Sequence, residues 1–355
     1  MKDIRRPPLP GAAPDIAPGP AARKERVTMT TCLIIGGGGM LGQGLAGALT
    51  ARGTLAGAAL SHMTLFDVVP ARAPEGGIPV SVETGDLCAP GEAERLVSSR
   101  PDVIYHLAAI VSGEAERDFE KGYRINLDGT RNLFEAIRAE HGRSGYCPRV
   151  VFTSSLAVFG IPLPDVIGDD YVVTPLSSYG TQKAIGELLL ADYSRRGFFD
   201  GIGLRLPTIV IRPGKPNAAA SGFFSSILRE PLAGKEAVLP VGTDVRHWLA
   251  SPRAAVGYLV HAGDLDTAAM GGRRNITLPG VSVTVGEQIE ALRKVAGDEA
   301  VALIRHQPDP AVEAIISTWP KAFDTRRALD LGFAGDASID AIITAYLEDH
   351  AGAAS

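Results

Sequence analysis

A tyrosine and a lysine stand four residues apart near the middle of the chain, in the stretch "YGTQK". On a helix this spacing places Tyr179 and Lys183 on one face. A free phenol has a pKa of about 10 and is a poor base at neutral pH, but a nearby ammonium group favours the phenolate. The pair could therefore accept a proton from a substrate hydroxyl. Because the chain has eight tyrosines, the spacing can also arise by chance, and the neighbouring motifs must decide.

Two polar residues upstream of the pair could share its chemistry. Ser155 ends the apolar run "VVFTSS", where its hydroxyl could donate to the same substrate oxygen, or could simply begin a turn. Asn126 stands in "NLDGT", inside a predicted helix, and is either functional or a packing or capping residue. We expect His106, at the end of "VIYH", to be structural.

A glycine-rich loop near the N-terminus suits a nucleotide. Gly36, Gly39 and Gly42 follow an apolar strand and open a predicted helix in "GGGGMLG". Glycines at these places let a turn tighten and let the backbone approach a pyrophosphate at a helix N-terminus. The alternative is a glycine-rich turn that binds nothing.

The next two predicted strands end in acidic residues. Asp67 closes "TLFD", the expected place for a carboxylate that accepts from a ribose 2′-hydroxyl; the same charge would repel a 2′-phosphate and so favours NAD over NADP. Arg72, five residues on, could complicate that preference. Asp86, in "GDL", could accept from an adenine amino group. Either acid could instead cap a turn.

The elements that must position these residues alternate between strand and helix. Strands are predicted at 31–35, 62–69, 79–87, 101–110, 149–160 and 201–211, and helices from the glycine loop to Gly53, at 91–100, 119–140 and 177–197. Such alternation predicts an α/β fold, a doubly wound parallel (Rossmann) sheet with helices on both faces. Shorter helices and strands after residue 212 predict a smaller C-terminal lobe over the carboxyl ends of the strands. We assign 29–210 and about 245–275 to the NAD-binding domain, and 211–244 and 276–355 to the substrate-binding lobe.

Composition narrows the class of protein. The 355 residues are 45% hydrophobic with a net charge of −5, and no basic block follows the N-terminal segment, so a nucleic-acid partner is not expected. Three widely spaced cysteines give neither a metal site nor a disulfide framework and fit the cytoplasm. No transmembrane span is predicted, because seven glycines interrupt the uncharged stretch 27–51. The Pro-rich segment 1–28 is expected to be a disordered tail.

In this order, "GGGGMLG", "GDL", "HLAA", "NLDGT", "SSLAVFG", "YGTQK" and "DTRRALDLGF" resemble the motifs of the extended short-chain dehydrogenase/reductase (NAD-dependent epimerase/dehydratase) family, over about residues 31–350. The resemblance implies NAD binding, catalysis by Ser155, Tyr179 and Lys183, and dimerisation through the helices carrying Asn126 and Tyr179. It also implies that Asn126 helps to hold Lys183 through a water relay. The cofactor-binding residues that it implies are Gly36, Gly39, Met40, Leu41, Gly42, Asp67, Asp86, Leu87, Leu107, Ala108, Ala109, Tyr179, Lys183 and Pro207.

Longer stretches, among them "RLPTIVIRPGKPNAAASGFFSSILREPL", resemble the D-erythronate dehydrogenase family within this branch. That resemblance implies oxidation of the C2 hydroxyl of a small sugar acid to the 2-keto acid, with a cation for the carboxylate. The candidate substrate residues are Ser112, Ser155, Thr208, Arg212, Asn217 and Arg246. A nucleotide-sugar 4-epimerase, a dehydrogenase of threonate, a uronate or L-threonine, and a non-catalytic NAD(P) sensor are the alternatives.

Overall fold

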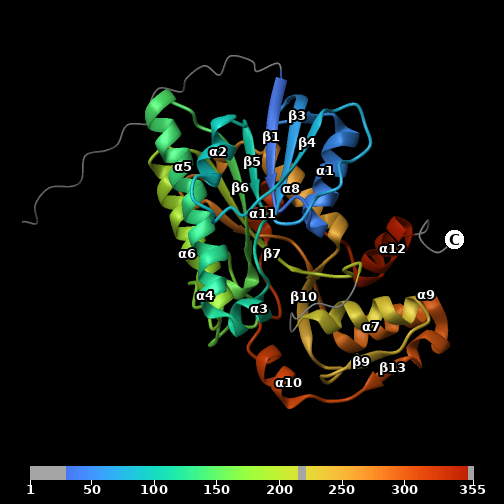
Figure 1. Ribbon diagram of the computed structural model, residues 1–355. Coiled ribbons are helices and arrows are strands. Elements are labelled where there is room, and N and C mark those ends of the chain that lie inside the picture. The colour runs from blue at the N-terminus through green and yellow to red at the C-terminus, as the bar shows by residue number, and fades with distance from the viewer. Residues whose placement is uncertain (1–28, 215–220, 351–355) are drawn as a thin grey trace, which may run out of the picture.

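The computed structural model describes residues 29–214 and 221–350. Within them lies an eight-stranded sheet whose parallel strands run in the order β4 (Val80–Thr84), β3 (Ala58–Asp67), β1 (Met29–Ile35), β5 (Val103–His106), β6 (Arg149–Ser155), β7 (Asp200–Leu206) and β11 (Asn275–Thr277). The two-residue strand β2 (Thr54–Leu55) pairs antiparallel with the start of β3. The direction of strand order reverses at β1. β3 and β4 lie on one side of β1, and β5, β6, β7 and β11 lie on the other side (Figure 1).

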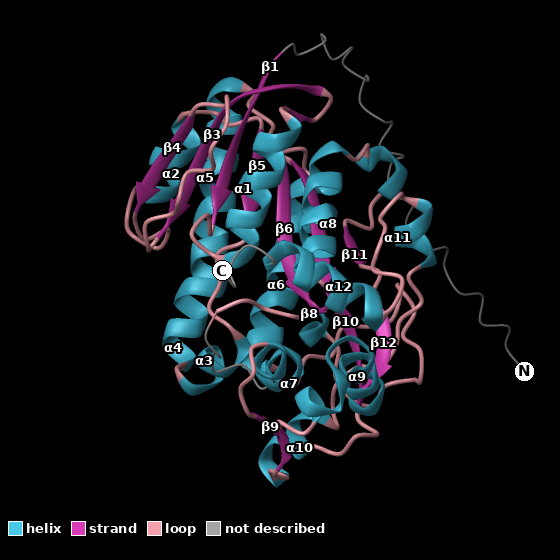
Figure 2. Cartoon of the chain, turned by 90° about the vertical axis from the view of Figure 1, so that its right-hand side faces the viewer, coloured by secondary structure: helices cyan, strands magenta, loops and turns pink. Residues whose placement is uncertain are grey.

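Helices cover both faces of the sheet (Figures 1 and 2), which confirms the doubly wound α/β prediction. α1 (Met40–Arg52) and α8 (Pro252–Asp264) pack on one face, around a buried cluster that includes Leu45, Met63 and Leu259. α2 (Glu92–Ser98), α5 (Gly129–Ser144) and α6 (Ser178–Arg195) pack on the other. The apolar strands are buried from both sides, as in other parallel sheets.

The long helix expected at 119–140 is continuous but not uniformly α-helical. α4 (Phe119–Gly122) passes into a π-helical turn, η1 (Tyr123–Asp128), and then into α5. The π turn contains Asn126, and such turns often mark functional positions. A short helix, α3 (Ser112–Arg117), precedes this assembly.

Strand β5 is shorter than the predicted strand 101–110. It ends at His106, after which the backbone N–H groups of Leu107 and Ala108 both donate to Ile35 O, at 2.8 and 3.0 Å. The shared acceptor turns the chain away from the sheet, so residues 107–111 form a loop at its carboxyl edge. β6 likewise stops at Ser155 and continues as the 3₁₀ turn η2 (Leu156–Val158).

The C-terminal part of the chain builds a second cluster of elements below the sheet (Figure 1). A three-stranded sheet contains β8 (Thr208–Ile209), β10 (Arg246–Ala250) and β12 (Val281–Thr284), and β9 (Ala237–Leu239) pairs with β13 (Ile304–His306). The helices are α7 (Gly222–Leu232), α9 (Val285–Val301), α10 (Pro310–Ile316) and α12 (Ile339–His350). α11 (Arg326–Asp330) lies instead beside β11 (Figure 2), and its Ala328 is buried in the cluster that α1 and α8 share with the main sheet. Phe224, Leu292 and Ile343 lie fully buried in the core that α7, α9 and α12 share.

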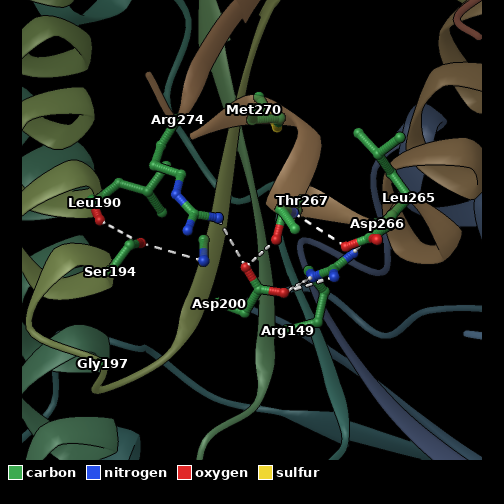
Figure 3. Close-up of polar contacts among 12 residues, drawn as sticks. Arg149, Leu190, Ser194, Gly197, Asp200, Leu265, Asp266, Thr267, Met270 and Arg274 are labelled. Carbon is green, nitrogen blue, oxygen red and sulfur yellow. Dashed lines mark hydrogen bonds and ion pairs between the residues drawn. The ribbon is translucent and has the colours of Figure 1, made fainter. Parts of the chain in front are cut away.

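A charged cluster ties the sheet to α8 at the end opposite the strand carboxyl ends (Figure 3). Arg149, at the start of β6, donates to Asp200 at 2.6 Å and to the carbonyl oxygens of Ala262 and Leu265 at 2.9 and 2.8 Å. Arg274 donates to the other oxygen of Asp200, at 2.9 Å. Across the described residues, no helix is both long and apolar enough to cross a bilayer.

Candidate active site

The glycine loop between β1 and α1 leaves a helix N-terminus open to an anion. Gly36 adopts φ +93°, and a Cβ there would lie 2.7 Å from Ala108 N. A Cβ at Gly42 would lie 2.2 Å from Gly36 O, so the helix packs against the loop only without a side chain. α1 has Gly39 as its N-cap, with no side-chain cap hydrogen bond and no acid in its first turn. The first N–H groups of α1 therefore remain available for phosphate oxygens.

Asp67 lies beside this loop, at the end of β3. Its Oδ2 accepts from Gly38 N at 2.9 Å, which places the carboxylate next to the open end of α1. Arg72 lines a hollow of about 290 Å³ beside α1, together with Gln43 and Glu75. The two side chains thus border the same end of the loop, the end where an adenosine ribose would lie.

Asp86 is already engaged by a cation. Arg124, on the π turn, donates to its Oδ2 at 2.7 Å and holds the pKa of that carboxyl below its usual value, and Cys88 N donates to Oδ1 at 2.9 Å. An adenine amino group that donated to Asp86 would thus share this carboxylate with Arg124. The neighbouring Leu87 is buried in the core against α2 and α5.

The loop after β5 and the loop after β7 lie at the same edge of the sheet as the glycine loop. Leu107, Ala108 and Ala109 are half-buried, and Gly36 contacts the backbone of the first two. Pro207 is buried directly after β7, whose last residue Leu206 pairs with Ser155. The residues predicted to contact the cofactor therefore gather at the carboxyl ends of β1, β3, β5 and β7, where ligands bind in open α/β sheets.

Ser155, Tyr179 and Lys183 form one cluster. The Ser155 hydroxyl lies close enough to the Tyr179 phenol to lower the pKa of that phenol, and its Oγ accepts from Ala157 N at 3.1 Å. Lys183 is 2% exposed; its Nζ donates to Thr153 O at 2.8 Å and lies 5.8 Å from the centroid of the Tyr179 ring. The helix N-cap Ser177 and the absence of a Cβ at Gly180, which would lie 2.1 Å from Ala157 O, fix α6 against the end of β6. A serine hydroxyl, a phenol and an ammonium group thus converge, as the motif order predicts.

Burial shifts the pKa of both ionisable groups in this cluster. Desolvation raises the pKa of Tyr179 to about 12, and the Ser155 hydrogen bond only partly opposes it. Desolvation lowers the pKa of Lys183 to about 8, with the Glu187 charge acting in the opposite direction. Lys183 is not among the groups that shift the pKa of Tyr179. That the ammonium group and a positive nicotinamide together favour the phenolate therefore stays a prediction.

Asn126 lies 1% exposed in the π turn, but its side chain does not reach toward Lys183. Its Oδ1 accepts from Ile110 N at 2.9 Å, and its Nδ2 donates to Ile110 O at 3.2 Å and to Gln182 Oε1 at 2.8 Å. These bonds fasten the loop after β5 to α6. The side chain is thus a clamp between the predicted cofactor loop and the catalytic helix, and the water relay to Lys183 stays a prediction.

Sequence reasoning missed a buried ion pair behind the catalytic cluster. Glu187, one helical turn after Lys183, accepts from Arg205 at 2.7 Å and from Ser154 Oγ at 2.5 Å, and both members of the ion pair are less than a tenth exposed. Glu187 and Arg205 lie 18 residues apart on different elements, so no local spacing in the sequence signals the pair. The pair joins α6 to β6 and β7 at the level of the cluster.

The candidate substrate residues have different surroundings. Ser112 begins α3, directly after the loop that follows β5, and is half-buried. Arg212 is half-buried and donates to Ser221 Oγ at 3.2 Å. Burial and the nearby charge of Arg229 lower its pKa. Within the described part of the chain, no carboxylate pairs with Arg212. Asn217 lies outside the described residues.

Arg246 and Thr208 are both hydrogen-bonded within the lobe. Arg246 donates to Ser282 O at 2.9 Å and pairs with Glu287 at 3.4 Å, so its charge is partly neutralised. Thr208 Oγ1 lies 2.7 Å from a ring nitrogen of His247. Of the lobe cations that we predicted and that the structure describes, Arg212 is thus the one without an acidic partner.

The residues present fit a dinucleotide. The uncapped start of α1, the absence of room for a Cβ at Gly36 and Gly42, and the carboxylate of Asp67 form the cradle that a pyrophosphate and ribose require. Over residues 29–214 and 221–350, no group of three or more His, Cys, Asp or Glu side chains could hold a metal ion.

Comparison with known proteins agrees with this geometry. The chain is 52% identical to a D-erythronate dehydrogenase of Cupriavidus necator over 323 residues, which are 89% of this chain and 98% of that protein. It is 43% identical to a D-erythronate dehydrogenase of Haemophilus influenzae, over 89% of this chain and 98% of the relative.

A solved structure with a different description is also similar. The crystal structure of a nucleoside-diphosphate-sugar epimerase from Agrobacterium tumefaciens superposes with a TM-score of 0.89 at 59% identity, and the match covers 94% of this chain and 98% of that one. Residues 32–276 match the NAD dependent epimerase/dehydratase family, and this match spans the glycine loop, Asp67, Asn126 and the cluster of Ser155, Tyr179 and Lys183. Because that match covers more than half of the chain and the curated relatives match along nearly their whole length, the chain belongs to the NAD dependent epimerase/dehydratase family.

Proposed function

We propose that the protein is an NAD-dependent dehydrogenase that oxidises the C2 hydroxyl of D-erythronate to 2-dehydro-D-erythronate. The observation that carries the proposal is the cluster of Ser155, Tyr179 and Lys183 beside a dinucleotide cradle, in a chain 52% identical to a D-erythronate dehydrogenase over nearly its full length. The intact pair of Tyr179 and Lys183 also argues against a non-catalytic NAD(P) sensor.

The geometry of the glycine loop supports the following roles for the predicted cofactor residues. The N–H groups of Met40 and Leu41 at the open end of α1 would bind the pyrophosphate, and Asp67 would accept from the adenosine ribose. Lys183 would hold the nicotinamide ribose. Asp67→Ala is expected to weaken the preference for NAD over NADP, and an unchanged ratio of kcat/KM for the two cofactors would contradict the ribose contact.

Tyr179 is the proposed general base. Its oxygen accepts the C2 hydroxyl proton while the C2 hydrogen leaves as hydride, so the products are a ketone, a reduced cofactor and a protonated tyrosine. NAD, when bound, supplies the hydride acceptor. Ser155 donates to the reacting oxygen and fixes its position beside Tyr179. Lys183, whose ammonium group is anchored on Thr153 O, keeps positive charge next to the phenol.

Arg212 is the proposed partner of the substrate carboxylate. It is a half-buried cation that no carboxylate within the described part of the chain neutralises, whereas Arg229 beside it pairs with Glu230 at 2.6 Å. A small anion would satisfy this charge and form charge-assisted hydrogen bonds with the guanidinium group. Ser112 and Thr208 are proposed to contact the remaining hydroxyls, and Arg246 and Asn217 remain secondary candidates.

The description of the Agrobacterium structure supports a second candidate, a nucleotide-sugar 4-epimerase. An epimerase must bind a diphosphate, and Arg246 is the other arginine among the candidate substrate residues. Its guanidinium group is instead bound to Ser282 O and Glu287. Among the candidate arginines that the structure describes, Arg212 is thus the one without an acidic partner, which suits a single carboxylate better than a diphosphate.

One experiment separates the candidates. The purified protein and NAD are incubated in turn with D-erythronate, L-threonate, L-threonine, glucuronate and UDP-glucose, and NADH is followed by absorbance. We expect net NADH with D-erythronate and none with UDP-glucose. Conversion of UDP-glucose to UDP-galactose without NADH would overturn the dehydrogenase, and a higher kcat/KM for another acid would change the substrate.

We further propose a cytoplasmic homodimer formed through the helix that carries Asn126 and through α6. Leu188 on α6 and Phe119 on α4 are 66% and 59% exposed, and a contact between two copies of the chain through these helices would bury both side chains. Cys32, Cys88 and Cys147 form no disulfide with one another, which suits a reducing compartment. Light scattering of the wild type and of Leu188→Glu tests the interface, and an unchanged mass in the variant would contradict it.

A further inference from the structure

His247 is a buried histidine that the proposed chemistry does not yet use. It lies on β10, is 2% exposed, and stacks on Phe224 with ring centroids 5.1 Å apart and an interplanar angle of 15°. Trp319 packs against its other side, also at 5.1 Å. Its Nδ1 lies 3.0 Å from Pro320 O, and its Nε2 lies 2.7 Å from Thr208 Oγ1. The ring is therefore fixed by two aromatic neighbours and two hydrogen bonds.

These contacts decide the tautomer. A carbonyl oxygen only accepts, so the Nδ1 of His247 must carry a hydrogen and donate to Pro320 O. Burial lowers the pKa of His247 to about 4, so the ring is neutral near pH 7 and its Nε2 has a lone pair. The Thr208 hydroxyl must then donate to Nε2. Because a hydroxyl has one hydrogen, Thr208 Oγ1 offers any other partner only lone pairs.

Thr208 stands where a substrate would pass. It follows Pro207 and begins β8, two residues after Leu206, the residue of β7 that pairs with Ser155 on β6. Thr208 is half-buried, so the residue as a whole is not enclosed by the protein. The short strand β8 pairs with β10 through Thr208 and Leu249, which keeps Thr208 in register with the strand that carries His247.

We propose that Thr208 is a substrate-binding residue that accepts a hydrogen bond from a hydroxyl of the sugar acid other than the one oxidised, and that His247 is the positioning residue that makes Thr208 an acceptor. The proposal rests on the proposed function and narrows its substrate class: the acid must carry a hydroxyl on C3 or C4. An acid with a carbonyl or ether oxygen at that place would bring two hydrogen-bond acceptors together, its own oxygen and Thr208 Oγ1, and this would weaken binding.

The test compares three substrates with three variants. The substrates are D-erythronate and its 3-deoxy and 4-deoxy analogues of the same C2 configuration; the variants are Thr208→Val, Thr208→Ser and His247→Phe. Thr208→Val removes the acceptor without changing the shape of the side chain. Thr208→Ser keeps it. His247→Phe keeps the aromatic stack but frees the hydroxyl hydrogen of Thr208.

We expect Thr208→Val to lower kcat/KM for D-erythronate by about 10–100-fold, mainly through KM, and to leave one deoxy analogue nearly unaffected, because that analogue lacks the recognised hydroxyl. Thr208→Ser should stay within a few-fold of the wild type. His247→Phe should bring kcat/KM for D-erythronate closer to kcat/KM for that analogue. If the histidine were merely structural, its replacement would lower kcat/KM for all three substrates equally. Thermal melting of each variant checks the fold.

Two outcomes count against the proposal. An equal loss for all three substrates in Thr208→Val and His247→Phe, or no loss in either, overturns the acceptor role while leaving the proposed function intact. No NADH from D-erythronate with the unaltered protein overturns the proposed function itself, and the inference with it.

Discussion

Tyr179 is held as a neutral phenol by its surroundings. Desolvation raises its pKa to about 12, the Ser155 hydroxyl opposes this only in part, and the Lys183 ammonium lies 5.8 Å from the ring centroid. A base that works near neutral pH needs a lower pKa, so further positive charge must arrive with the reactants. The positive nicotinamide ring of NAD would supply it. We therefore expect Tyr179 to act as a base when NAD is bound.

The general-base role is tested by Tyr179→Phe. Without the phenolic oxygen, the hydroxyl proton has no acceptor at the reacting centre, and we expect kcat to fall by about 10³-fold or more. NAD binding, measured by calorimetry, should change little, because the pyrophosphate and ribose contacts come from other residues. A rate within ten-fold of the wild type would remove Tyr179 from its role, and Tyr193→Phe, on the same helix, is the matched control.

The titration of Lys183 should make the free energy of unfolding rise with pH. Its pKa is lowered to about 8 in the folded protein, against a usual value near 10.5 in the unfolded chain. Between these values the unfolded state binds more protons, so the stability contributed by this group rises with pH. Lys183→Met removes the titrating group.

The free energy of unfolding, measured with urea in the absence of NAD, should therefore rise from pH 8 to pH 10 in the wild type relative to Lys183→Met. The relative gain is at most about 1.4 kcal/mol per pH unit. Below pH 8 the difference between the two proteins should be flat. A difference that falls over the upper range would contradict the assigned direction of the shift.

At the scale of elements, two glycines of α1, Gly42 and Gly47, differ in whether their position requires glycine. Gly42 faces the turn after β1, where a Cβ would lie 2.2 Å from Gly36 O and 2.8 Å from Gly37 Cα. Gly47, in the same helix, has no atom within 4 Å of the place where its Cβ would be. The first position needs glycine for contact between helix and loop, and the second does not.

Gly42→Ala and Gly47→Ala are therefore a matched pair. We expect Gly42→Ala to displace the start of α1 from the loop, weakening NAD binding by at least ten-fold and lowering the melting temperature. Gly47→Ala should leave NAD binding unchanged and stabilise the protein by about 0.5–1 kcal/mol, because alanine favours the helix. Calorimetric titration with NAD and thermal melting give both quantities, and equal effects at the two positions would refute the packing argument.

At the scale of the whole molecule, local patterns predicted the sheet and the catalytic cluster but not the contacts between distant segments. The glycine loop, Asp67 and the strand-end Ser155 could be found because each carries a motif on its own element. The π turn around Asn126 could not, since the surrounding sequence reads as an ordinary helix. His247 carries no local signal either: its partners Thr208 and Pro320 lie 39 and 73 residues away in sequence. The boundaries of the substrate lobe stay a prediction.

The cluster around Arg149 supports the molecule from the end opposite the site. Arg149 and Asp200 begin β6 and β7, whereas Ser155 and Leu206 end them (Figure 3). Besides its ion pair, Arg149 donates to three carbonyl oxygens at the end of α8, so one side chain joins two strands and a helix from the far part of the chain. Its side chain is 12% exposed, so water does not replace these bonds readily.

Arg149→Met should leave those carbonyl groups without a donor and Asp200 with Arg274 as its remaining cation, and we expect a loss of about 3–5 kcal/mol in unfolding free energy. Arg138→Met, which removes an exposed arginine paired with Glu135, should lower the free energy of unfolding much less, because solvent screens that pair. Because the cluster lies at the amino ends of the strands, kcat and KM at low temperature should be the same in both variants as in the wild type. Chemical denaturation measures the free energy of unfolding, and NADH production gives kcat and KM. A change in KM for Arg149→Met without a loss of stability would mean that the cluster affects the active site rather than the packing of α8 on the sheet.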